Sequence, residues 1–146
     1  MLKGVNWISV IIAFVLLEVL GYVWYGVVFS KAWIDEMNAV GLKPDMSSSA
    51  QTTSLAIGAV LIIVQVLGLS WLLRKVGAAT LAAGVTAALA AYVFFALPTQ
   101  GMEYAYMGFT PKLMAINCGQ LLISYLLAGA VLGGVKFGRA AAPAAA

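Results

Sequence analysis

One acidic side chain, Glu18, lies inside the apolar segment that runs from Asn6 to Phe29. With a helical rise of about 1.5 Å per residue, this segment is long enough to cross the roughly 30 Å hydrocarbon core of a membrane. Glu18 falls about 16 Å along it from Trp7, and therefore near mid-depth. A charge at that depth costs several kcal/mol, so we expect Glu18 to be protonated, paired or facing a wet cavity.

Glu18 has two possible roles. Because burial disfavours the charged carboxylate, the side chain could carry protons and exchange them for a cationic ligand. Alternatively, a protonated Glu18 could donate a hydrogen bond to a neighbouring helix, a contribution of about 0.6–2 kcal/mol. The lack of a second charge in the apolar segments favours the structural role.

Other polar side chains are expected at a similar depth in the remaining apolar segments. Asn117, Gln120 and Ser124 share one helical face by their spacing, and Tyr22 follows Glu18 by one turn. The candidate polar cluster consists of Glu18, Tyr22, Gln65, Tyr92, Asn117, Gln120 and Ser124. The cluster could bind a polar headgroup, a water chain or a small cation. Interhelical hydrogen bonding is favoured over these, because no member is strongly nucleophilic.

The elements that must position this cluster are four apolar helices, at about residues 6–29, 51–73, 78–97 and 113–135. Of the 146 residues, 64% are hydrophobic and 9% are charged, against about 25% charged in soluble domains. Pro98 is expected to end the third helix, since proline breaks the hydrogen-bond ladder. We predict an all-α, four-transmembrane-helix bundle, with one domain at 1–139 and a disordered alanine-rich tail at 140–146.

A short amphipathic helix is expected in the long link after the first apolar helix. Trp33, Met37 and Val40 fall on one helical face, with charged residues mostly elsewhere. This pattern is typical of a helix that lies in the membrane interface. Gly41 is placed to end the helix, and Pro44 prevents it from resuming.

The distribution of basic residues predicts the orientation of the chain. Five lie on the side of the two termini and three on the other: Lys3, Arg74, Lys75, Lys136 and Arg139 against Lys31, Lys43 and Lys112. This difference favours an orientation with both termini in the cytoplasm. The net charge of +3 is spread over helix ends and forms no block, so no nucleic-acid partner is expected.

Small residues recur at four-residue spacing and predict close helix packing. They are Ala83, Ala87 and Ala91, with Gly84 and Ala88 beside them, and the pair Gly129 and Gly133. Such stripes let helix backbones approach each other within a chain or between two chains. Both the intrachain contact and a homodimer therefore remain open.

The composition argues against an enzyme or a metal protein. The chain has no histidine and a single cysteine, Cys118, which excludes histidine-based zinc sites, histidine general bases and C-x-x-C redox pairs. The loop acids have no calcium-binding spacing. We expect no cofactor, no metal and no catalytic residues.

A short segment of the first helix is similar in sequence to a short segment of the third. Gly21-Tyr22-Val23-Trp24-Tyr25 is similar to Ala91-Tyr92-Val93-Phe94-Phe95, and both segments lie at the outer end of a helix. A shared belt of interfacial aromatic residues explains this likeness better than a duplication does.

A longer motif carries a family resemblance. The string Gly21-x-x-Trp24-Tyr25-Gly26-x-x-Phe29-x-Lys31-x-Trp33 resembles the opening signature of the bacterial membrane proteins grouped as domain of unknown function 1761. Ile116-Asn117 followed by Gly129 and Gly133 is similar to the closing segment of that family. The resemblance implies a four-helix domain in the bacterial cytoplasmic (inner) membrane and carries no activity with it.

These observations favour a non-catalytic packing or accessory component that self-associates or joins a larger membrane assembly. A small proton-coupled transporter of a cationic or amphipathic compound, using Glu18, is the alternative. A lipid-binding module is a third possibility. The lipid bilayer is the one partner that all three share.

Overall fold

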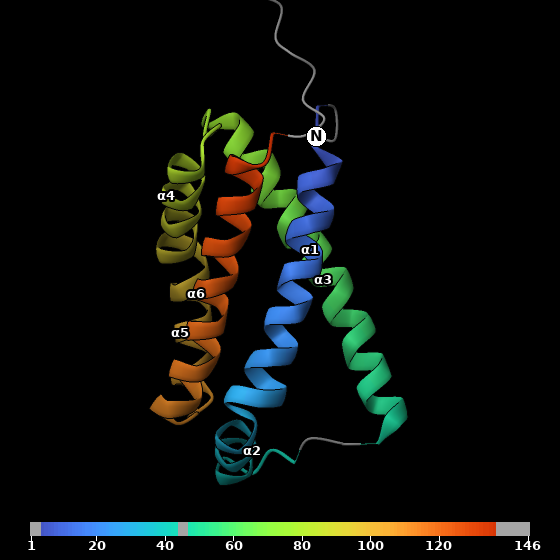
Figure 1. Ribbon diagram of the computed structural model, residues 1–146. Coiled ribbons are helices and arrows are strands. Elements are labelled where there is room, and N and C mark those ends of the chain that lie inside the picture. Colours follow the sequence, from blue (N-terminus) through green and yellow to red (C-terminus); the bar gives the residue numbers. More distant parts are fainter. Residues whose placement is uncertain (1–3, 44–46, 137–146) are drawn as a thin grey trace, which may run out of the picture.

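The computed structural model describes residues 4–43 and 47–136 (Figure 1). Within these residues the chain forms helices and no strands, which confirms the all-α prediction. The elements are α1 (Trp7–Val23), the π-helical turn η1 (Trp24–Val28), α2 (Ser30–Ala39), α3 (Ser48–Lys75), α4 (Leu81–Ala91), the π-helical turn η2 (Tyr92–Ala96), α5 (Leu97–Tyr106) and α6 (Pro111–Gly134). The predicted tail at 140–146, Lys3, Pro44 and Arg139 lie outside the described residues.

Four continuous helices in the described part are long and apolar enough to cross a membrane: Trp7–Val28, Ser48–Lys75, Leu81–Tyr106 and Pro111–Gly134. The predicted helices were therefore found, with shifted ends. The short helix expected in the link after the first apolar helix is α2, and it ends just before Gly41, which adopts a φ of +78°, a backbone conformation that favours glycine.

The predicted end of the third helix at Leu97 is wrong. The helix begins at Leu81 and continues through Pro98 to Tyr106. In the π turn η2, the amide of Leu97 bonds to the carbonyl of Tyr92, five residues back. A new α-helical segment begins there, so Pro98 falls in its first turn, where a missing N–H is tolerated.

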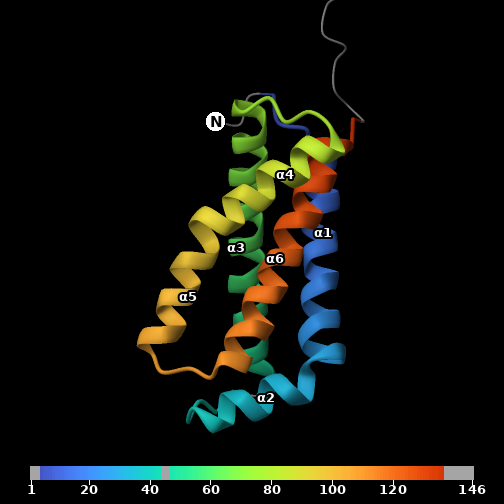
Figure 2. The ribbon, with the colours of Figure 1, turned by 90° about the vertical axis from the view of Figure 1, so that its left-hand side faces the viewer.

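Helix α6 lies at the centre of the arrangement (Figures 1 and 2). It contacts α4 on one side and α1 on the other, and α3 packs against α1 and α6. The start of α1, the α3–α4 turn and the end of α6 share one end of the molecule. Helix α2 crosses the opposite end, which we call the α2 end (Figure 2).

The closest helix contact joins α4 to α6 through glycines. A Cβ added to Gly84 would lie 2.9 Å from Cα of Gly133, and one added to Gly133 would lie 2.5 Å from the Thr80 carbonyl oxygen. Such distances are too short for any side chain, so these positions require glycine. Ala91 is buried in the core, and Ala83 and Ala87 are partly buried against it. The small-residue stripes of α4 and α6 therefore pack within one chain.

The end opposite α2 is closed by Asn6. Its side-chain oxygen accepts from the Ser9 amide at 3.3 Å and caps α1, and its Nδ2 donates to the Val135 carbonyl at 3.0 Å. Behind it, α1 and α3 bury a seam of apolar side chains made of Val10, Ala13, Leu17, Val66, Leu69 and Leu73. From this anchored end, α3 diverges from α1 towards the α2 end (Figure 1).

Candidate functional site

The two sequence motifs meet at the α2 end. The indole N–H of Trp24, in η1, donates to the Ile116 carbonyl of α6 at 3.0 Å. The Trp24 ring lies over Gly119, where an added Cβ would be 3.3 Å from the ring. Gly119 thus provides the space in which the first motif packs against the second.

A hydrogen-bonded chain continues this contact. The hydroxyl of Tyr25 donates to Oδ1 of Asn117 at 2.8 Å. The amide nitrogen of Asn117 in turn donates to the hydroxyl of Tyr104 on α5. Asn117 therefore joins the end of the first membrane-length helix to the end of the third.

Three aromatic contacts brace these residues. The ring centroids of Trp24 and Phe29 are 4.7 Å apart, and those of Tyr25 and Trp33 are 5.5 Å apart. On the other side of Asn117, Tyr104 meets Phe109 edge-on at 5.0 Å. Each such contact contributes about 0.5–1.5 kcal/mol beyond the buried area. The aromatic residues of the first motif therefore help to hold α2 in place, and Tyr104 with Phe109 does the same for the α5–α6 turn.

The two π turns aim aromatic side chains at the same part of α6. Trp24 in η1 donates to Ile116, and Tyr92 in η2 donates to the Cys118 carbonyl at 2.9 Å. A π turn inserts one extra residue and so changes which face of the helix the following side chains present. The echoed segments of the first and third helices thus share a local distortion and a common partner helix.

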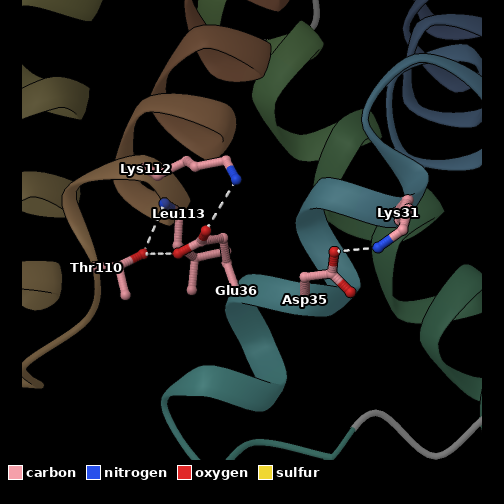
Figure 3. A network of polar contacts seen from close by, with 6 residues as sticks. All are labelled: Lys31, Asp35, Glu36, Thr110, Lys112 and Leu113. Atoms are coloured by element: carbon pink, nitrogen blue, oxygen red, sulfur yellow. Dashed lines mark hydrogen bonds and ion pairs between the residues drawn. The ribbon is translucent and has the colours of Figure 1, made fainter.

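An ionic and hydrogen-bonded contact fastens α2 beneath the start of α6 (Figure 3). The Glu36 carboxylate accepts a hydrogen bond from the hydroxyl of Thr110 and lies 3.0 Å from Nζ of Lys112. The same Thr110 hydroxyl accepts from the Leu113 amide at 3.0 Å and caps α6. An acidic group at a helix N-terminus is also favoured by the helix dipole.

The charged form of Glu36 is stabilised by this environment. The hydrogen bond from Thr110, followed by the hydrogen bond and charge of Lys112, lowers the pKa of Glu36 below its ordinary value of 4.5. By contrast, the motif residue Lys31 pairs with Asp35 at 2.6 Å on the exposed face of α2, where side chains are well solvated. Exposed pairs of this kind contribute little to stability.

A groove with a volume of about 380 Å³ lies between α2, α5 and α6. Its apolar walls are Trp33, Met37, Leu42, Phe109, Leu113 and Leu121. Its polar lining consists of Tyr25, Gln100, Tyr104, Asn117 and Gln120. We call this space the α2 groove. It is about the size of a small-molecule site, and its lining is mostly apolar with a few convergent polar groups.

One lining residue of the α2 groove, Gln100, has a polar atom without a partner. Its side-chain oxygen is buried and accepts no hydrogen bond from any described residue. Four residues further along α5, the Tyr104 hydroxyl accepts from Asn117 and so retains its own proton for donation. Tyr104 is thus a lining residue that can donate a hydrogen bond to a molecule in the groove.

The predicted polar cluster is distributed over several places in the fold. Asn117 belongs to the chain described above, and Gln120 donates to the Ser124 hydroxyl at 3.1 Å on α6. Tyr92 is buried and bonds to Cys118, whereas Tyr22 is 73% exposed and faces away from the other members. No hydrogen bond in the described part of the chain joins these residues to Glu18.

Glu18 on α1 and Gln65 on α3 each bury a polar atom without a partner. Oε1 of Glu18 and Nε2 of Gln65 find no hydrogen-bond partner among residues 4–43 and 47–136. Buried polar atoms without partners are costly and rare in native proteins. These two side chains are the strongest alternative to the α2 groove.

Sequence reasoning missed two groove residues, Gln100 and Tyr104. They are four residues apart and share a face once the segment is helical. The signal was present in the sequence, but the prediction that the helix ended before Pro98 assigned both residues to a loop. Two motif glycines have no close-contact role: an added Cβ at Gly21 would meet nothing within 4 Å, and one at Gly26 would meet only Tyr22, at 3.7 Å.

Three further observations concern other possible sites. A hollow of about 530 Å³ at the opposite end lies between Thr80, Leu81 and the end of α6, and small and apolar residues dominate its lining. Among the described residues, no three His, Cys, Asp or Glu side chains come close enough to hold a metal ion. A small hollow of about 10 Å³ at that opposite end is lined by Asn6, Ser9, Ser70 and Arg74. The α2 groove combines several polar groups with a volume large enough for a ligand.

The fold and this site define a small helical protein with helices of membrane-spanning length, whose two signature segments meet beside a groove. The family model described as "Protein of unknown function (DUF1761)" matches residues 8–133, so the chain belongs to this family. The matched range covers the motif in α1–α2 and the motif in α6, which confirms the resemblance noted in the sequence. No curated protein and no solved structure matches the chain.

Proposed function

We propose that the protein is a non-catalytic membrane component that binds an amphipathic lipid in the α2 groove. The observation that carries this proposal is the α2 groove itself, a hollow of about 380 Å³ whose lining combines apolar side chains with uncharged amides and phenols. An amphipathic molecule would place its polar end against the amides and phenols and cover the apolar walls with its chain.

The position of the α2 groove supports a ligand drawn from the membrane. Tyr25, Tyr104 and Asn117 lie near the α2 ends of three membrane-length helices. Aromatic residues such as Tyr25 and Trp33 are typical of the level at which lipid headgroups meet the hydrocarbon. A lipid could therefore reach the groove without leaving the bilayer.

The chemistry of the lining supports binding over catalysis. The polar groups are amides and phenols, which orient ligands and are weak nucleophiles and bases at neutral pH. The nearby acid, Glu36, is already committed to Thr110 and Lys112. A reaction would require an activated group that this lining does not supply.

The test is native mass spectrometry of the protein extracted gently from membranes. Wild type should retain bound lipid. Leu42→Trp, which fills the groove from a lining position, should lose most of it. Leu55→Trp introduces the same change on α3 at a residue that is 68% exposed and outside the groove, and should retain the lipid. Equal retention by both variants would contradict binding in the α2 groove.

A proton-coupled transporter is the second candidate, favoured by the unpartnered atoms of Glu18 and Gln65. A carboxyl near the middle of a membrane-length helix could exchange a proton for a cationic compound. The experiment is proton-driven uptake of a cationic dye into vesicles. Loss of uptake in Glu18→Gln would support transport, and Gln65→Leu is a second variant for the same measurement. Full uptake in Glu18→Gln would exclude the role proposed for Glu18.

Self-association is a further proposal, with α3 as the contacting surface. Because Gly129 and Gly133 already pack against α4, a dimer would use a different face. Leu55, Leu61 and Val64 on α3 are each at least 60% exposed and could lie against lipid or a second copy. A monomer without partners after gentle extraction would contradict this proposal and a role in a larger assembly.

We also propose that the protein lies in the bacterial inner membrane with both termini in the cytoplasm. The start of α1 and the end of α6 share one end of the molecule, where Arg74 and Lys75 also lie in the last turn of α3. The α2 end carries Asp35 and Glu36 together with its basic residues. A fluorescent protein fused to the C-terminus should fold and fluoresce, whereas an active alkaline phosphatase fusion there would reverse the orientation.

A further inference from the structure

We propose that a second lipid site lies at the end opposite α2, where an anionic phospholipid docks in the hollow between the start of α4 and the end of α6. We call this space the α4–α6 hollow, and its volume is about 530 Å³. The site is separate from the α2 groove and does not depend on it. Its ligand follows from the charge at this end of the molecule, from the exposed polar groups of the lining and from the apolar walls.

The end opposite α2 is positively charged. Arg74 and Lys75 lie in the last turn of α3, and Lys136 follows the end of α6 and lines the hollow. Among residues 4–43 and 47–136, the acids lie in α2, in α5 and near the middle of the first membrane-length helix: Glu18, Asp35, Glu36 and Glu103. A basic residue near a membrane surface gains about a fivefold affinity for anionic lipid.

The segment that carries Lys136 is anchored beside the basic end of α3. The Val135 amide donates to the Val131 carbonyl at 2.9 Å, and the Val135 carbonyl accepts from Nδ2 of Asn6 at 3.0 Å. Asn6 also lines the small hollow that is lined by Arg74. The positive charges of α3 and of Lys136 are thus brought to the same end by contacts within the fold.

The α4–α6 hollow offers two exposed groups to a phosphate. Thr80 and Lys136 both line it, and both residues are exposed. The Thr80 hydroxyl accepts from the Ala83 amide at 3.2 Å and so retains its own proton for donation. Within the described part of the chain, the carboxylates that form ion pairs are those of Asp35 and Glu36, at the other end. A phosphate oxygen can therefore accept from both groups, with its charge offset by the ammonium of Lys136.

The walls of the hollow suit the start of an acyl chain. Leu81, Ala130 and Val131 contribute apolar lining. Gly134 adds no side chain between the walls, and a Cβ there would lie 3.3 Å from Cβ of Leu81. At about 30 Å³ for each water-sized unit, a space of about 530 Å³ holds about 18 non-hydrogen atoms. That is enough for a phosphate headgroup and the first carbons of a chain.

An apolar row leads from the hollow along α4. Leu81, Val85 and Leu89 are four residues apart and share one helical face. Leu81 is 60% exposed and Leu89 is 40% exposed, so both side chains are open to a lipid chain. The hollow lies where one membrane-length helix begins and another ends (Figure 2). A lipid would thus place its phosphate at the helix ends and its chain along α4.

These features together favour an anionic phospholipid over other ligands. A free anion would leave the apolar row uncovered. A zwitterionic lipid would bring its own cation next to the basic residues of this end, which costs part of the attraction. An anionic phospholipid matches both the charge and the apolar surface.

Photoaffinity labelling with three matched phospholipids tests the site. The probes share an acyl chain with a diazirine and differ in the headgroup: anionic phosphoglycerol, zwitterionic phosphoethanolamine and zwitterionic phosphocholine. The full-length protein in phosphatidylcholine nanodiscs is irradiated with a trace of each probe, and labelled peptides are mapped by mass spectrometry. We expect the anionic probe to label peptides that contain Leu81 or Val131 at least about fivefold more strongly than the others. Peptides that contain Leu55, at the start of α3, should show no preference.

Two lysine variants distinguish a site from a general field of positive charge. Lys136→Gln removes the charge in the lining and should abolish most of the preference for the anionic probe. Lys75→Gln removes the same charge from the same end, at an exposed residue outside the lining, and should retain most of the preference. Because both positions are exposed, both variants should fold as wild type does by circular dichroism.

Filling the hollow is an independent check. Ala130→Trp places a large side chain in the lining and should lower labelling by the anionic probe to the level of the zwitterionic probes. Ala90→Trp makes the same change at an exposed position of α4 outside the lining and should retain the preference. Should Ala130→Trp fold poorly, the lysine variants and the comparison of probes on wild type still decide the question.

Four outcomes would overturn the proposal. The first two are equal labelling near Leu81 by all three probes and equal loss of the preference in Lys136→Gln and Lys75→Gln. The third is loss of the preference with inorganic phosphate but not with sodium chloride at the same ionic strength, which would assign the hollow to a free anion. The fourth is weak labelling there by every probe, which would show that protein, such as a second copy, covers the hollow. None of these results would alter the proposal for the α2 groove.

Discussion

The hydroxyl of Tyr25 donates a 2.8 Å hydrogen bond to Oδ1 of Asn117, joining two residues that are 92 positions apart in the chain. Tyr25 belongs to the motif at the end of the first membrane-length helix, and Asn117 belongs to the motif in α6. Because Asn117 also donates to Tyr104, this one amide holds three segments of the α2 end together. The contact between the two motifs thus gives a structural reason for their residues. The α2 groove lies beside this contact.

Asn117 is therefore the residue whose loss should most disturb the α2 end. Asn117→Leu removes two hydrogen bonds and leaves the phenols of Tyr25 and Tyr104 without this partner. We expect the free energy of unfolding to fall by about 2–3 kcal/mol. Thermal unfolding in detergent, followed by circular dichroism, measures this. Asn38→Leu, at an exposed position on α2, is the matched control, and equal stability of the two variants would contradict the structural role of Asn117.

The glycine contact between α4 and α6 predicts a strong effect of a single methyl group. Gly84→Ala would place its Cβ against the backbone of Gly129 and Gly133, which must then move apart. The expected destabilisation is at least about 1–3 kcal/mol, as for other overpacked sites. Gly58→Ala is the control, because a Cβ there meets nothing within 4 Å and alanine favours the helix. If Gly84→Ala unfolds like Gly58→Ala, the close approach of α4 and α6 is wrong.

The lowered pKa of Glu36 predicts how the docking of α2 against α6 depends on pH. Its pKa in the folded protein lies below the ordinary value of 4.5, so its contribution is present above that pH and is lost as the pH falls through the lowered pKa. The protection factors of the α2 amides, which correct for the slower intrinsic exchange in acid, should therefore be high at neutral pH and should fall below the ordinary pKa.

Glu36→Gln separates this effect from general acid denaturation. The variant should show faster exchange in α2 already at neutral pH, and less further change in acid. Asp35→Asn alters the exposed pair with Lys31 and should retain the behaviour of wild type. A pH dependence in Glu36→Gln that equals that of wild type would show that another group controls α2.

Substitution of Trp24 should lower the free energy of unfolding less than substitution of Asn117. Trp24→Phe keeps an aromatic ring over Gly119 but loses the hydrogen bond to the Ile116 carbonyl. The expected loss is about 1 kcal/mol, because that carbonyl also belongs to the α6 backbone ladder. Trp71→Phe at a partly exposed position of α3 is the comparison. If Trp24→Phe and Trp71→Phe unfold at the same temperature, the hydrogen bond from Trp24 to the Ile116 carbonyl does not stabilise the protein.

Hydropathy and periodicity predicted the helices well because membrane-length apolar segments leave few alternatives. The amphipathic face of α2 was also predictable, and Trp33 and Met37 on that face line the groove. The extension of the third helix past Pro98 could not be predicted, because it depends on the π turn at Tyr92–Ala96. No local propensity in that segment marks where a π turn begins.

The candidate site was predicted less well, because depth along a helix does not determine which way a side chain faces. Glu18 and Asn117 were expected in one cluster, yet Asn117 pairs with tyrosines of the α2 end and Glu18 has no hydrogen bond to it. Tyr22 follows Glu18 by one turn and is still largely exposed. The faces of helices are decided by tertiary packing, here by the contact of Gly84 with Gly129 and Gly133.

The central claim is that the α2 groove binds a lipid, and methyl NMR of the methionines tests it most directly. Met37 lines the groove, whereas Met102 is 57% exposed and lies outside it. The protein would be labelled at its methionine methyl groups, reconstituted in nanodiscs and titrated with dodecanol, with Met37→Leu used to assign the signal. We predict that the Met37 signal shifts saturably and that the Met102 signal does not. Shifts of both signals in proportion to dodecanol, or no shift of Met37, would contradict a lipid site in this groove.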